Sequence, residues 1–578
     1  MKKRWLAISK TLNRAAAIKF IQALVAILGL MFCNVVAQKS AVAQVADTNA
    51  TAFPLKLEKR YLNLPVRNGA TSRHLSLLVE GQMAREFDIE LADSQPDWWT
   101  FLDLTSFKGR QGTIKVDKFP GSLNGLKAIY QSDEIEGQEN LYHEPLRPQF
   151  HFTSRRGWLN DPNGLVFYKG EYHLFYQHNP YGWNSGNLTW GHAVSADLVH
   201  WQELANALYP DEHGAMWSGS AVVDWHNTAG FQTGAEKALV AIFAAAGHPF
   251  TQGIAYSNDR GRTWIKYKNN PVLQNITSEN RDPKVLWYAP EKKWIMALYL
   301  DQSNYGLFGS VNLKTWEKLS DVNIPGDSEC PEFFELAVGG KTGEKRWIFY
   351  GGKGRYLIGT FDGKAFTPES GPHTLQQGNC WYASQTFNDI PAADGRRILI
   401  PWGQIAMPGM PFNQMMGIPV ELKLVTTEAG LRLAANPVHE LTCLRTRSKG
   451  IKSQPLHPGE NLLAKVKGKL LDVTAEIGIG EAKEIGINLR GVPVTYDVEK
   501  QELSCQNRKA LLKPEQGRIR LRLLVDQTSI DIFGNEGILY MPMGMIIPAD
   551  DTAVEVFAKG GNAQIDALKV YELKSAWK

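Results

Sequence analysis

Three carboxylates in this sequence each stand just before a proline and a hydrophobic segment. Asp161 and Asp282 are followed directly by proline, and Glu329 is followed by a Cys-Pro pair. If these acids converge in the fold, their like charges raise the pKa of one group while another stays ionised. One carboxylic acid can then donate a proton while a carboxylate attacks, which is the arrangement that cleaves glycosidic bonds. The three acids therefore suggest glycoside chemistry, provided that the fold brings them together.

A repeated strand pattern indicates how they could meet. After each acid come two hydrophobic segments and then a short polar signature, which begins at Ser195, Ser257, Ser310 and, in weaker form, Thr360. Successive signatures start 62, 53 and 50 residues apart. Repeats of roughly this length that contain several short strands are typical of β-propeller blades with inserted loops. The predicted blades begin near Asp161, Ser218, Asp282, Glu329 and Tyr382, which makes five blades.

In a propeller the first strand of every blade lines the central channel, so equivalent positions in different blades converge on one axis. Each acid also has a simpler explanation. Asp161 belongs to a good turn sequence, Asp282 could form a surface ion pair with Arg281, and Glu329 could be an isolated solvated side chain. Because turn chemistry does not explain why all three acids stand at blade starts, we favour the catalytic interpretation.

Six motifs follow one another along the chain and begin at Trp158, Phe175, Trp190, Ser218, Arg281 and Glu329. In this order they resemble those of glycoside hydrolase family 32, the family of β-fructofuranosidases that includes invertases, inulinases and levanases. The similarity extends from about His151 to the C-terminus. It implies a five-bladed propeller followed by a β-sandwich, and a retaining mechanism that acts on terminal β-fructosyl units without a metal or organic cofactor.

The resemblance also implies roles for individual residues. Asp161 would be the nucleophile and Glu329 the general acid/base, while Asp282, paired with Arg281, would stabilise the transition state through fructose hydroxyls. For the polar residues at sugar-contacting positions, hydrogen bonding to the blade backbone is an equally good alternative. The residues expected to bind substrate are Asn160, Gln177, Trp183, Trp190, Trp217, Ser218, Arg281, Tyr382 and Trp402.

This chain departs from the family pattern at three places. Ser185 stands where the family usually has a tryptophan, so one aromatic wall of the fructose pocket is missing unless Trp183 replaces it. Cys380 occupies the place of a usual acidic residue, and Glu332 replaces the usual aspartate after the Cys-Pro pair. The three catalytic positions are intact, so these changes bear on substrate preference.

These features predict an enzyme that releases fructose from levan, inulin or sucrose, with exo action favoured. Two alternatives stay open: a fructosyltransferase that uses the same intermediate, and a catalytically silent propeller that only binds fructan. The sequence selects neither the β-2,6 nor the β-2,1 linkage, and it does not indicate an oligomeric state.

Strand patterns continue on both sides of the propeller. Hydrophobic and charged residues alternate around Phe87 in residues 53–138, and the alternation returns around Leu521 in residues 448–578. We therefore predict an all-β chain with an N-terminal β-sandwich-like module, a five-bladed propeller catalytic domain over residues 145–440, and a C-terminal β-sandwich. The N-terminal module is an addition to the basic family architecture, and support of the propeller is slightly favoured over carbohydrate binding as its role.

The first 43 residues have the pattern of a signal peptide. Basic residues precede the apolar run from Ala23 to Phe32, and a small-residue cleavage site ends at Ala43. A secreted or periplasmic protein without membrane attachment after cleavage is expected, and Phe32 before Cys33 disfavours a lipid anchor. A retained membrane anchor stays open as an alternative, because the basic region is unusually long. Because all seven charged residues in this segment are positive, the formal charge of +4 becomes −3 after cleavage, which leaves no nucleic-acid footprint.

The four remaining cysteines, at positions 330, 380, 443 and 505, are widely spaced and show no metal-binding pattern. We expect free thiols, with Cys330 and Cys380 buried near the pocket.

Overall fold

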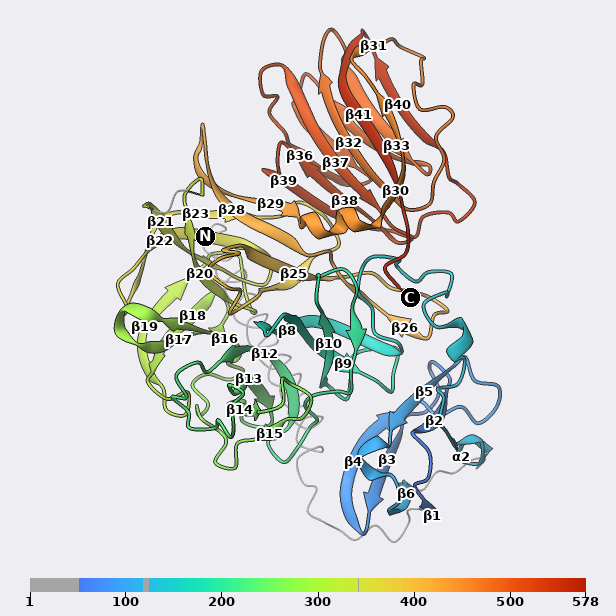
Figure 1. The fold of residues 1–578 in the computed structure, drawn as a ribbon, viewed down its shortest axis with the longest axis vertical. Coiled ribbons are helices and arrows are strands. Elements are labelled where there is room, and N and C mark those ends of the chain that lie inside the picture. Colours follow the sequence, from blue (N-terminus) through green and yellow to red (C-terminus); the bar gives the residue numbers. More distant parts are fainter. Residues whose placement is uncertain (1–50, 118–123, 341–342, 578) are drawn as a thin grey trace, which may run out of the picture.

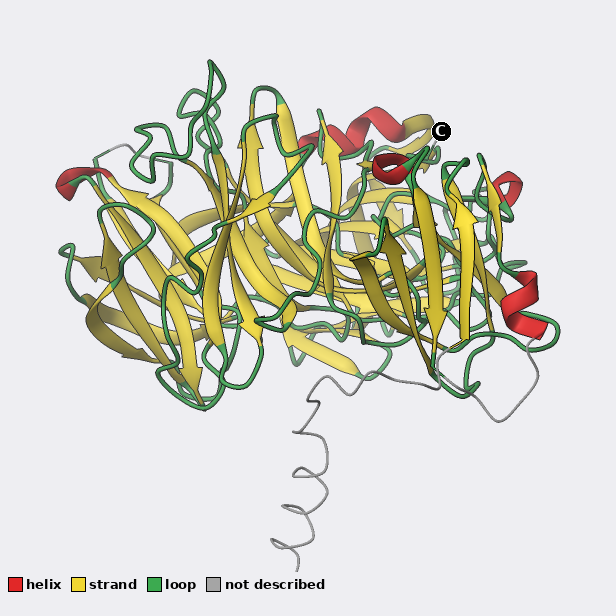
Figure 2. Ribbon diagram, turned by 90° about the horizontal axis from the view of Figure 1, so that it is seen from below, coloured by secondary structure: helices red, strands yellow, loops and turns green. Residues whose placement is uncertain are grey.

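The computed structural model describes residues 51–117, 124–340 and 343–577 and consists almost entirely of β-sheets (Figures 1 and 2). The predicted signal peptide lies outside the described residues. Among the residues that are described, no helix is long and apolar enough to cross a membrane. The helices are η1 (Thr105–Phe107), α2 (Asn124–Ala128), η2 (Gln138–Asn140), η3 (Ala289–Glu291) and η4 (His439–Leu444).

Two sheets form the N-terminal module. Alternate residues of its strands, such as Leu75 and Leu77, are buried and meet in one hydrophobic core between the sheets, as the period of two predicts. This confirms the additional β-rich module. One sheet has the order β1 (Thr51–Lys56), β6 (Gln111–Val116), β3 (Arg73–Val79), β4 (Gln82–Ile89), and the other β5 (Trp98–Asp103), β2 (Tyr61–Val66), β7 (Tyr130–Ser132).

Five antiparallel sheets follow as the blades of a propeller, which confirms the predicted fold (Figure 1). Blade 1 has β8 (Gly157–Tyr168), β9 (Glu171–Asn179), β10 (Thr189–Ser195) and β11 (Gln202–Glu203). Blade 2 has β12 (Ala215–Val223), β13 (Leu239–Ala246), β14 (Thr251–Ser257) and β15 (Ile265–Lys266). Blade 3 has β16 (Arg281–Tyr288), β17 (Lys293–Asp301), β18 (Asn304–Ser310) and β19 (Glu317–Asn323).

Blade 4 contains β20 (Glu332–Ala337), β21 (Lys345–Tyr350), β22 (Arg355–Phe361) and β23 (Phe366–Thr374). Blade 5 contains β24 (Tyr382–Thr386), β25 (Arg397–Gly403), β28 (Val420–Thr427) and β29 (Gly430–Pro437). Two short strands join the last blade to the first: β26 (Phe412–Asn413) pairs in parallel with β8, and β27 (Met415–Met416) pairs with β25.

The repeated polar signature forms the turn between the two outer strands of a blade. In blade 1 the Asp197 carboxylate accepts the backbone N–H groups of Val199 and His200 at 3.0 and 2.8 Å. Asn312 plays the same part in blade 3. The closing tryptophan of blade 1, Trp201, donates its indole N–H back to a carbonyl three residues earlier. The repeat therefore reflects turn chemistry on the outside of each blade.

Polar side chains tie the innermost strands, β8, β12, β16, β20 and β24, to one another across the channel. Gln385 of β24 donates to the carbonyl of Gly219 in β12 and accepts from the backbone of Leu165 in β8. Ser220 of β12 donates to the carbonyl of Pro283 in β16. Lys284 of β16 forms a buried ion pair with Glu332 of β20, at 2.9 Å. These contacts hold the five strand starts in fixed positions around one axis.

The C-terminal part is a sandwich of two sheets around its own core, as predicted. His151, at the start of the propeller, is fully buried against it and lies between Asp526 at 2.8 Å and Asp531 at 3.0 Å. One sheet contains β30 (Arg445–Ile451), β31 (Gln454–Leu456), β32 (Leu471–Gly478), β37 (Arg518–Val525), β38 (Ser529–Gly534), β39 (Leu539–Gly544) and β41 (Ala563–Leu573). The other contains β33 (Glu484–Leu489), β34 (Val492–Asp497), β35 (Glu502–Cys505), β36 (Arg508–Leu511) and β40 (Val554–Lys559).

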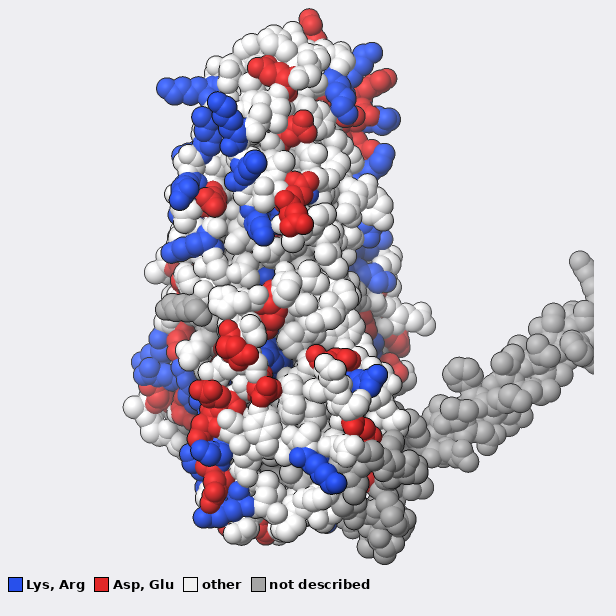
Figure 3. All heavy atoms as spheres, turned by 90° about the vertical axis from the view of Figure 1, so that its right-hand side faces the viewer, with Lys and Arg blue, Asp and Glu red and all other residues white. Residues whose placement is uncertain are grey.

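Charged side chains of both signs are interspersed over the face displayed in Figure 3. Among the described residues on this face, the basic groups are not gathered into a stripe. The surface shown there is therefore mixed in charge.

Candidate active site

The three predicted catalytic acids lie where innermost strands are distorted. Asp161 lies in β8 at a shift of strand register between Leu159 and Pro162. Asp282 lies at a similar shift at the start of β16 and has a φ of 61°, and Glu329, just before β20, has a φ of 60°. Bulges and left-handed residues redirect side chains from the regular alternation of a strand. The distortions thus allow acids from three blades to point into one space.

Hydrogen bonds hold both carboxylate oxygens of Asp161. Ser218 Oγ donates to Oδ2 at 2.6 Å, and Asn160 Nδ2 donates to Oδ1 at 3.1 Å. These donors are themselves fixed, because Gln177 Nε2 donates to Ser218 Oγ at 3.4 Å and Trp158 Nε1 donates to Asn160 Oδ1 at 3.0 Å. Burial raises the pKa of Asp161, and the hydrogen bonds oppose that rise.

Cys330 joins Asp161 to Asp282. Its thiol sulfur lies 3.5 Å from an oxygen of each carboxylate, and its backbone N–H donates to Asp282 Oδ2 at 3.0 Å. The side chain of Asp282 is only 7% exposed. Burial and the nearby charge of Asp161 raise the pKa of Asp282 to about 7. The two aspartates can therefore retain a proton at neutral pH.

Glu329 is the most open of the three acids, with 30% of its side chain exposed. Arg281 Nη2 donates to its Oε1 at 2.7 Å, and the Tyr382 hydroxyl donates to its Oε2. Burial alone would raise the pKa of Glu329, but the hydrogen bonds from Arg281 and Tyr382 outweigh it and keep this pKa below its usual value. Arg281 Nε also lies 3.9 Å from Asp282, so the guanidinium links two of the acids.

Aromatic rings surround this end of the channel. The ring centroid of Trp402 lies 6.0 Å from that of Trp158 and 6.2 Å from that of Tyr382, in edge-on geometry. Trp217 lies beside Arg281, whose guanidinium carbon is 5.7 Å from the ring centroid. Most of the expected substrate-binding residues thus join one connected group around the acids: Asn160, Gln177, Trp217, Ser218, Arg281, Tyr382 and Trp402.

Two expected substrate-binding residues take other positions. Trp190 is fully buried in a hydrophobic cluster between blades and donates its indole N–H to the carbonyl of Trp217 at 3.0 Å. No face of its ring is available to a sugar, so the prediction for Trp190 is wrong. Trp183 packs against the core of the N-terminal module, and its carbonyl accepts from Asn413 Nδ2 at 2.9 Å. Asn413 also pairs with Trp158 through the parallel β26–β8 contact, and the expected contact of Trp183 with substrate stays a prediction.

Sequence reasoning missed three aromatic residues of the site. Trp158 donates a hydrogen bond that orients Asn160. It is the first residue of the motif that contains Asn160, so its position in the motif could have identified it. Tyr299 lies 4.8 Å below the Arg281 guanidinium, and Phe250 packs 5.1 Å from Trp217. Tyr299 faces Arg281 across the β16–β17 pair, so only the strand register could have identified it.

Two of the three departures from the family pattern, Glu332 and Cys380, take part in contacts away from the three acids. Glu332 forms the channel ion pair with Lys284 and accepts a hydrogen bond from Thr386 at 2.6 Å. The backbone N–H of Cys380 donates to Pro542 of the sandwich, at 3.2 Å, and its side chain joins a hydrophobic cluster with Met407, Phe412 and Met415. The expectation that Cys380 is buried is confirmed, and its nearness to the pocket stays a prediction. The cysteines at positions 330, 380, 443 and 505 are all free.

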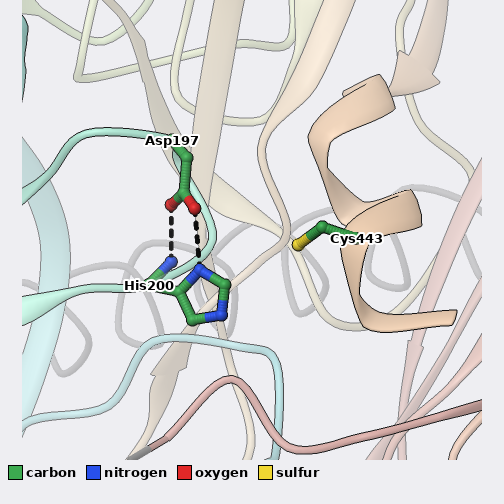
Figure 4. Close-up of side chains that lie close together, drawn as sticks. All are labelled: Asp197, His200 and Cys443. Atoms are coloured by element: carbon green, nitrogen blue, oxygen red, sulfur yellow. Dashed lines mark hydrogen bonds and ion pairs between the residues drawn. The ribbon is translucent and has the colours of Figure 1, made fainter. Parts of the chain in front are cut away.

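A group of possible metal ligands, Asp197, His200 and Cys443, lies outside the site (Figure 4). Asp197 Oδ2 lies 2.7 Å from His200 Nδ1, and its other oxygen accepts the turn N–H groups described above. Asn312 makes the corresponding turn in blade 3. The proximity of Asp197 and His200 is therefore explained by their shared turn, without a metal ion.

Comparison with known proteins agrees with this geometry. The domain described as "Glycosyl hydrolases family 32 N-terminal domain" matches residues 151–437, and "Glycosyl hydrolases family 32 C terminal" matches residues 440–572. The levanase of Bacillus subtilis (strain 168) is 40% identical over 502 residues, covering 78% of this chain and 74% of the levanase.

Two fungal proteins extend the comparison. The extracellular exo-inulinase of Aspergillus niger is 28% identical over 519 residues, covering 75% of this chain and 96% of the inulinase. The crystal structure of exo-inulinase from Aspergillus awamori matches with a TM-score of 0.69 and 27% identity, covering 75% of this chain and all of the other. The chain therefore belongs to glycosyl hydrolase family 32 and is a glycoside hydrolase.

Proposed function

We propose that this hydrolase releases fructose from the ends of β-fructosides, such as levan, inulin or sucrose, through a covalent fructosyl-enzyme intermediate. The observation that carries the proposal is the convergence of Asp161, Asp282 and Glu329 around Cys330 and Arg281. The names of the related levanase and exo-inulinases support the substrate class.

In the first step, an oxygen of Asp161 attacks the anomeric carbon of the terminal fructosyl unit. Glu329 donates a proton to the leaving oxygen as the glycosidic bond breaks, and an ester forms with Asp161. In the second step, Glu329 removes a proton from water, which attacks the anomeric carbon; the bond from this carbon to Asp161 breaks, and fructose and the free carboxylate are released. Arg281 and Asp282 would bind fructose hydroxyls, and Ser218 holds the attacking carboxylate in place at 2.6 Å.

The proton on Glu329 needs an explanation, because the hydrogen bonds from Arg281 and Tyr382 favour its ionised form. Asp282, with a pKa of about 7, retains a proton more readily. A bound sugar would compete for the Arg281 donor and exclude water from Glu329. Both changes raise the pKa of Glu329, so substrate binding itself would prepare the general acid.

The test compares fructose release from sucrose, inulin and levan by the wild type and by Asp161→Asn. We expect the substitution to lower kcat by at least about 10⁴-fold while the folded structure is retained. Asp389→Asn is the matched control, because Asp389 is another partly buried aspartate, with a pKa raised to about 6, bound to Val223 and Trp225 at the other end of the channel.

Substantial turnover by Asp161→Asn, or an equal loss in both variants, would contradict the assignment. Analysis of products at high sucrose separates hydrolysis from transfer, because a transferase accumulates longer oligosaccharides instead of free fructose.

We also propose that the enzyme is exported. The basic and apolar pattern of residues 1–43 supports this, as does the related exo-inulinase described as extracellular. N-terminal sequencing of the protein from the medium or periplasm should give Gln44 as its first residue, and a full-length protein found only in the cytoplasm would contradict export.

A further inference from the structure

A groove of about 310 Å³ separates the N-terminal module from the propeller. One wall is β4, and the other is the loop at 209–212 that leads from blade 1 into blade 2. Ligand sites usually occupy ~300–1,000 Å³, so the groove can hold a small ligand or a short part of a chain. Its lining includes Arg85, Phe87, Asn187, Tyr209 and Asp211.

We propose that this groove binds fructosyl units of a fructan chain at a distance from the unit that is cleaved. The proposal rests on the proposed function and adds a second binding site to it. The residues before 151 lie outside both family matches, so one wall of the groove comes from a part of the chain that the family domains do not include.

The chemistry of the groove suits a neutral polyhydroxylated ligand. The Arg85 guanidinium carbon lies 3.7 Å from the Tyr209 ring centroid, and its Nη1 donates to a backbone carbonyl. Its Nε is buried and has no hydrogen-bond partner among the described residues. The guanidinium therefore covers one face of the Tyr209 ring, and the stacked pair can contact the apolar and the hydroxyl-bearing sides of a sugar through the ring and the guanidinium plane. Glu86 and Glu212 also line the groove, which disfavours an anionic ligand.

Both walls are held in place by hydrogen bonds. Lys266 Nζ donates to the Tyr209 carbonyl at 2.5 Å and to Asp211 Oδ2 at 2.6 Å. On the opposite side, Asn187 accepts from the backbone N–H of Asp88 at 2.8 Å and donates to its carbonyl at 2.7 Å. A groove with preformed walls requires little ordering of side chains when a ligand binds.

The groove lies at the same end of the propeller as the catalytic acids. The loop that carries Asn187 leaves β9 after Asn179, which pairs with Trp158 beside the site. The loop that carries Tyr209 runs directly into β12, where Trp217 and Ser218 are located. Figure 1 shows β4 beside this part of the propeller, below β9 and β15. A chain bound at the active site could therefore continue over this face toward the groove.

The test compares a polymer with a disaccharide that cannot span the two places. In Tyr209→Ala and Arg85→Met, we expect KM for high-molecular-mass levan to rise about tenfold with kcat unchanged, while kcat and KM for sucrose stay at wild-type values. Tyr209→Phe keeps the ring and should keep the wild-type KM for levan.

The outcomes separate this site from the catalytic function. An unchanged KM for levan in Tyr209→Ala overturns the proposal, and a parallel change with sucrose overturns it too, since that reveals a purely structural role. If the wild type releases no fructose from sucrose, inulin or levan, the proposed function fails. The groove is then tested by affinity electrophoresis in levan-containing gels, where Tyr209→Ala, made in Asp161→Asn, should be retarded less than Asp161→Asn alone. Equal retardation overturns the groove.

Discussion

Replacing Asp282 by asparagine should make the enzyme more stable above neutral pH while it impairs the active site. Asp282 has a pKa of about 7, because it is buried and lies near Asp161. An unfolded aspartate has a pKa of about 4. Between these values the folded protein binds a proton that the unfolded chain has lost, so the stability of the wild type falls as the pH rises. Asparagine carries no charge and removes this dependence.

The size of the effect follows from the pKa difference. A difference of about 3 units at about 1.4 kcal/mol each gives an upper limit of about 4 kcal/mol. Asparagine can still accept the 3.0 Å hydrogen bond from the Cys330 N–H through its carbonyl oxygen, so this contact need not be lost. Relative to the wild type, we expect the variant to gain about 2–4 kcal/mol between about pH 4 and about pH 8.

Scanning calorimetry at several pH values measures this gain. For a domain of this size, ~1 kcal/mol corresponds to about 2 °C in Tm, so the difference in Tm between variant and wild type should widen by about 4–8 °C over the interval. Asp389→Asn, whose parent residue has a pKa of about 6, should show a similar but smaller widening. A difference in Tm that does not depend on pH would refute the conclusion that the fold raises the pKa of Asp282.

Three other substitutions test the electrostatics of the structure. Arg281→Met removes the 2.7 Å donor to Glu329, so the pKa of Glu329 should rise. Because Glu329 must be protonated to act as the general acid, the alkaline limb of the kcat/KM profile should then move to higher pH; an unmoved limb would exclude Arg281 as its cause. Ser218→Ala removes the 2.6 Å hydrogen bond to Asp161, so kcat should fall about 10–100-fold. Without this bond the pKa of Asp161 rises, so the loss should be smaller at higher pH, where Asp161 is ionised in both proteins; a loss independent of pH would contradict this. Asp531 and Asp526 raise the pKa of His151 to about 9 despite its burial, so the stability of the wild type should fall from about pH 6.5 to about pH 9. His151→Gln should abolish this pH dependence in urea titrations. A pH dependence that persists in the variant would assign it to another group.

The alternation and spacing of residues predicted the sheets and the blade starts because strand periodicity and turn chemistry are local properties. Asp197 and Asn312 illustrate this, since each forms its turn with residues only a few positions away. The motif around Asp161 likewise predicted that this residue lies at the start of a blade, because a blade start is determined by the hydrophobic strand that follows it.

Side-chain direction was predictable only where the neighbouring strand was known. Trp190 belongs to a conspicuous aromatic motif, yet the packing of blade 1 against blade 2 buries its ring completely. Tyr299 has no distinguishing signal in the chain and comes to lie under Arg281 through strand pairing. Cys380 stands two residues before Tyr382 but joins a cluster beside the sandwich, because its backbone N–H pairs with Pro542.

The order of residues was enough to predict the all-β architecture, the family and the three acids that the fold brings together, since each depends on short patterns. Which of these acids retains a proton depends on the tertiary structure, because it depends on the groups that other blades place beside each acid. Burial and Asp161 favour the proton on Asp282, whereas Arg281 and Tyr382 favour a charge on Glu329. These effects join groups from separate blades, and charges act through distance in space rather than through separation along the chain.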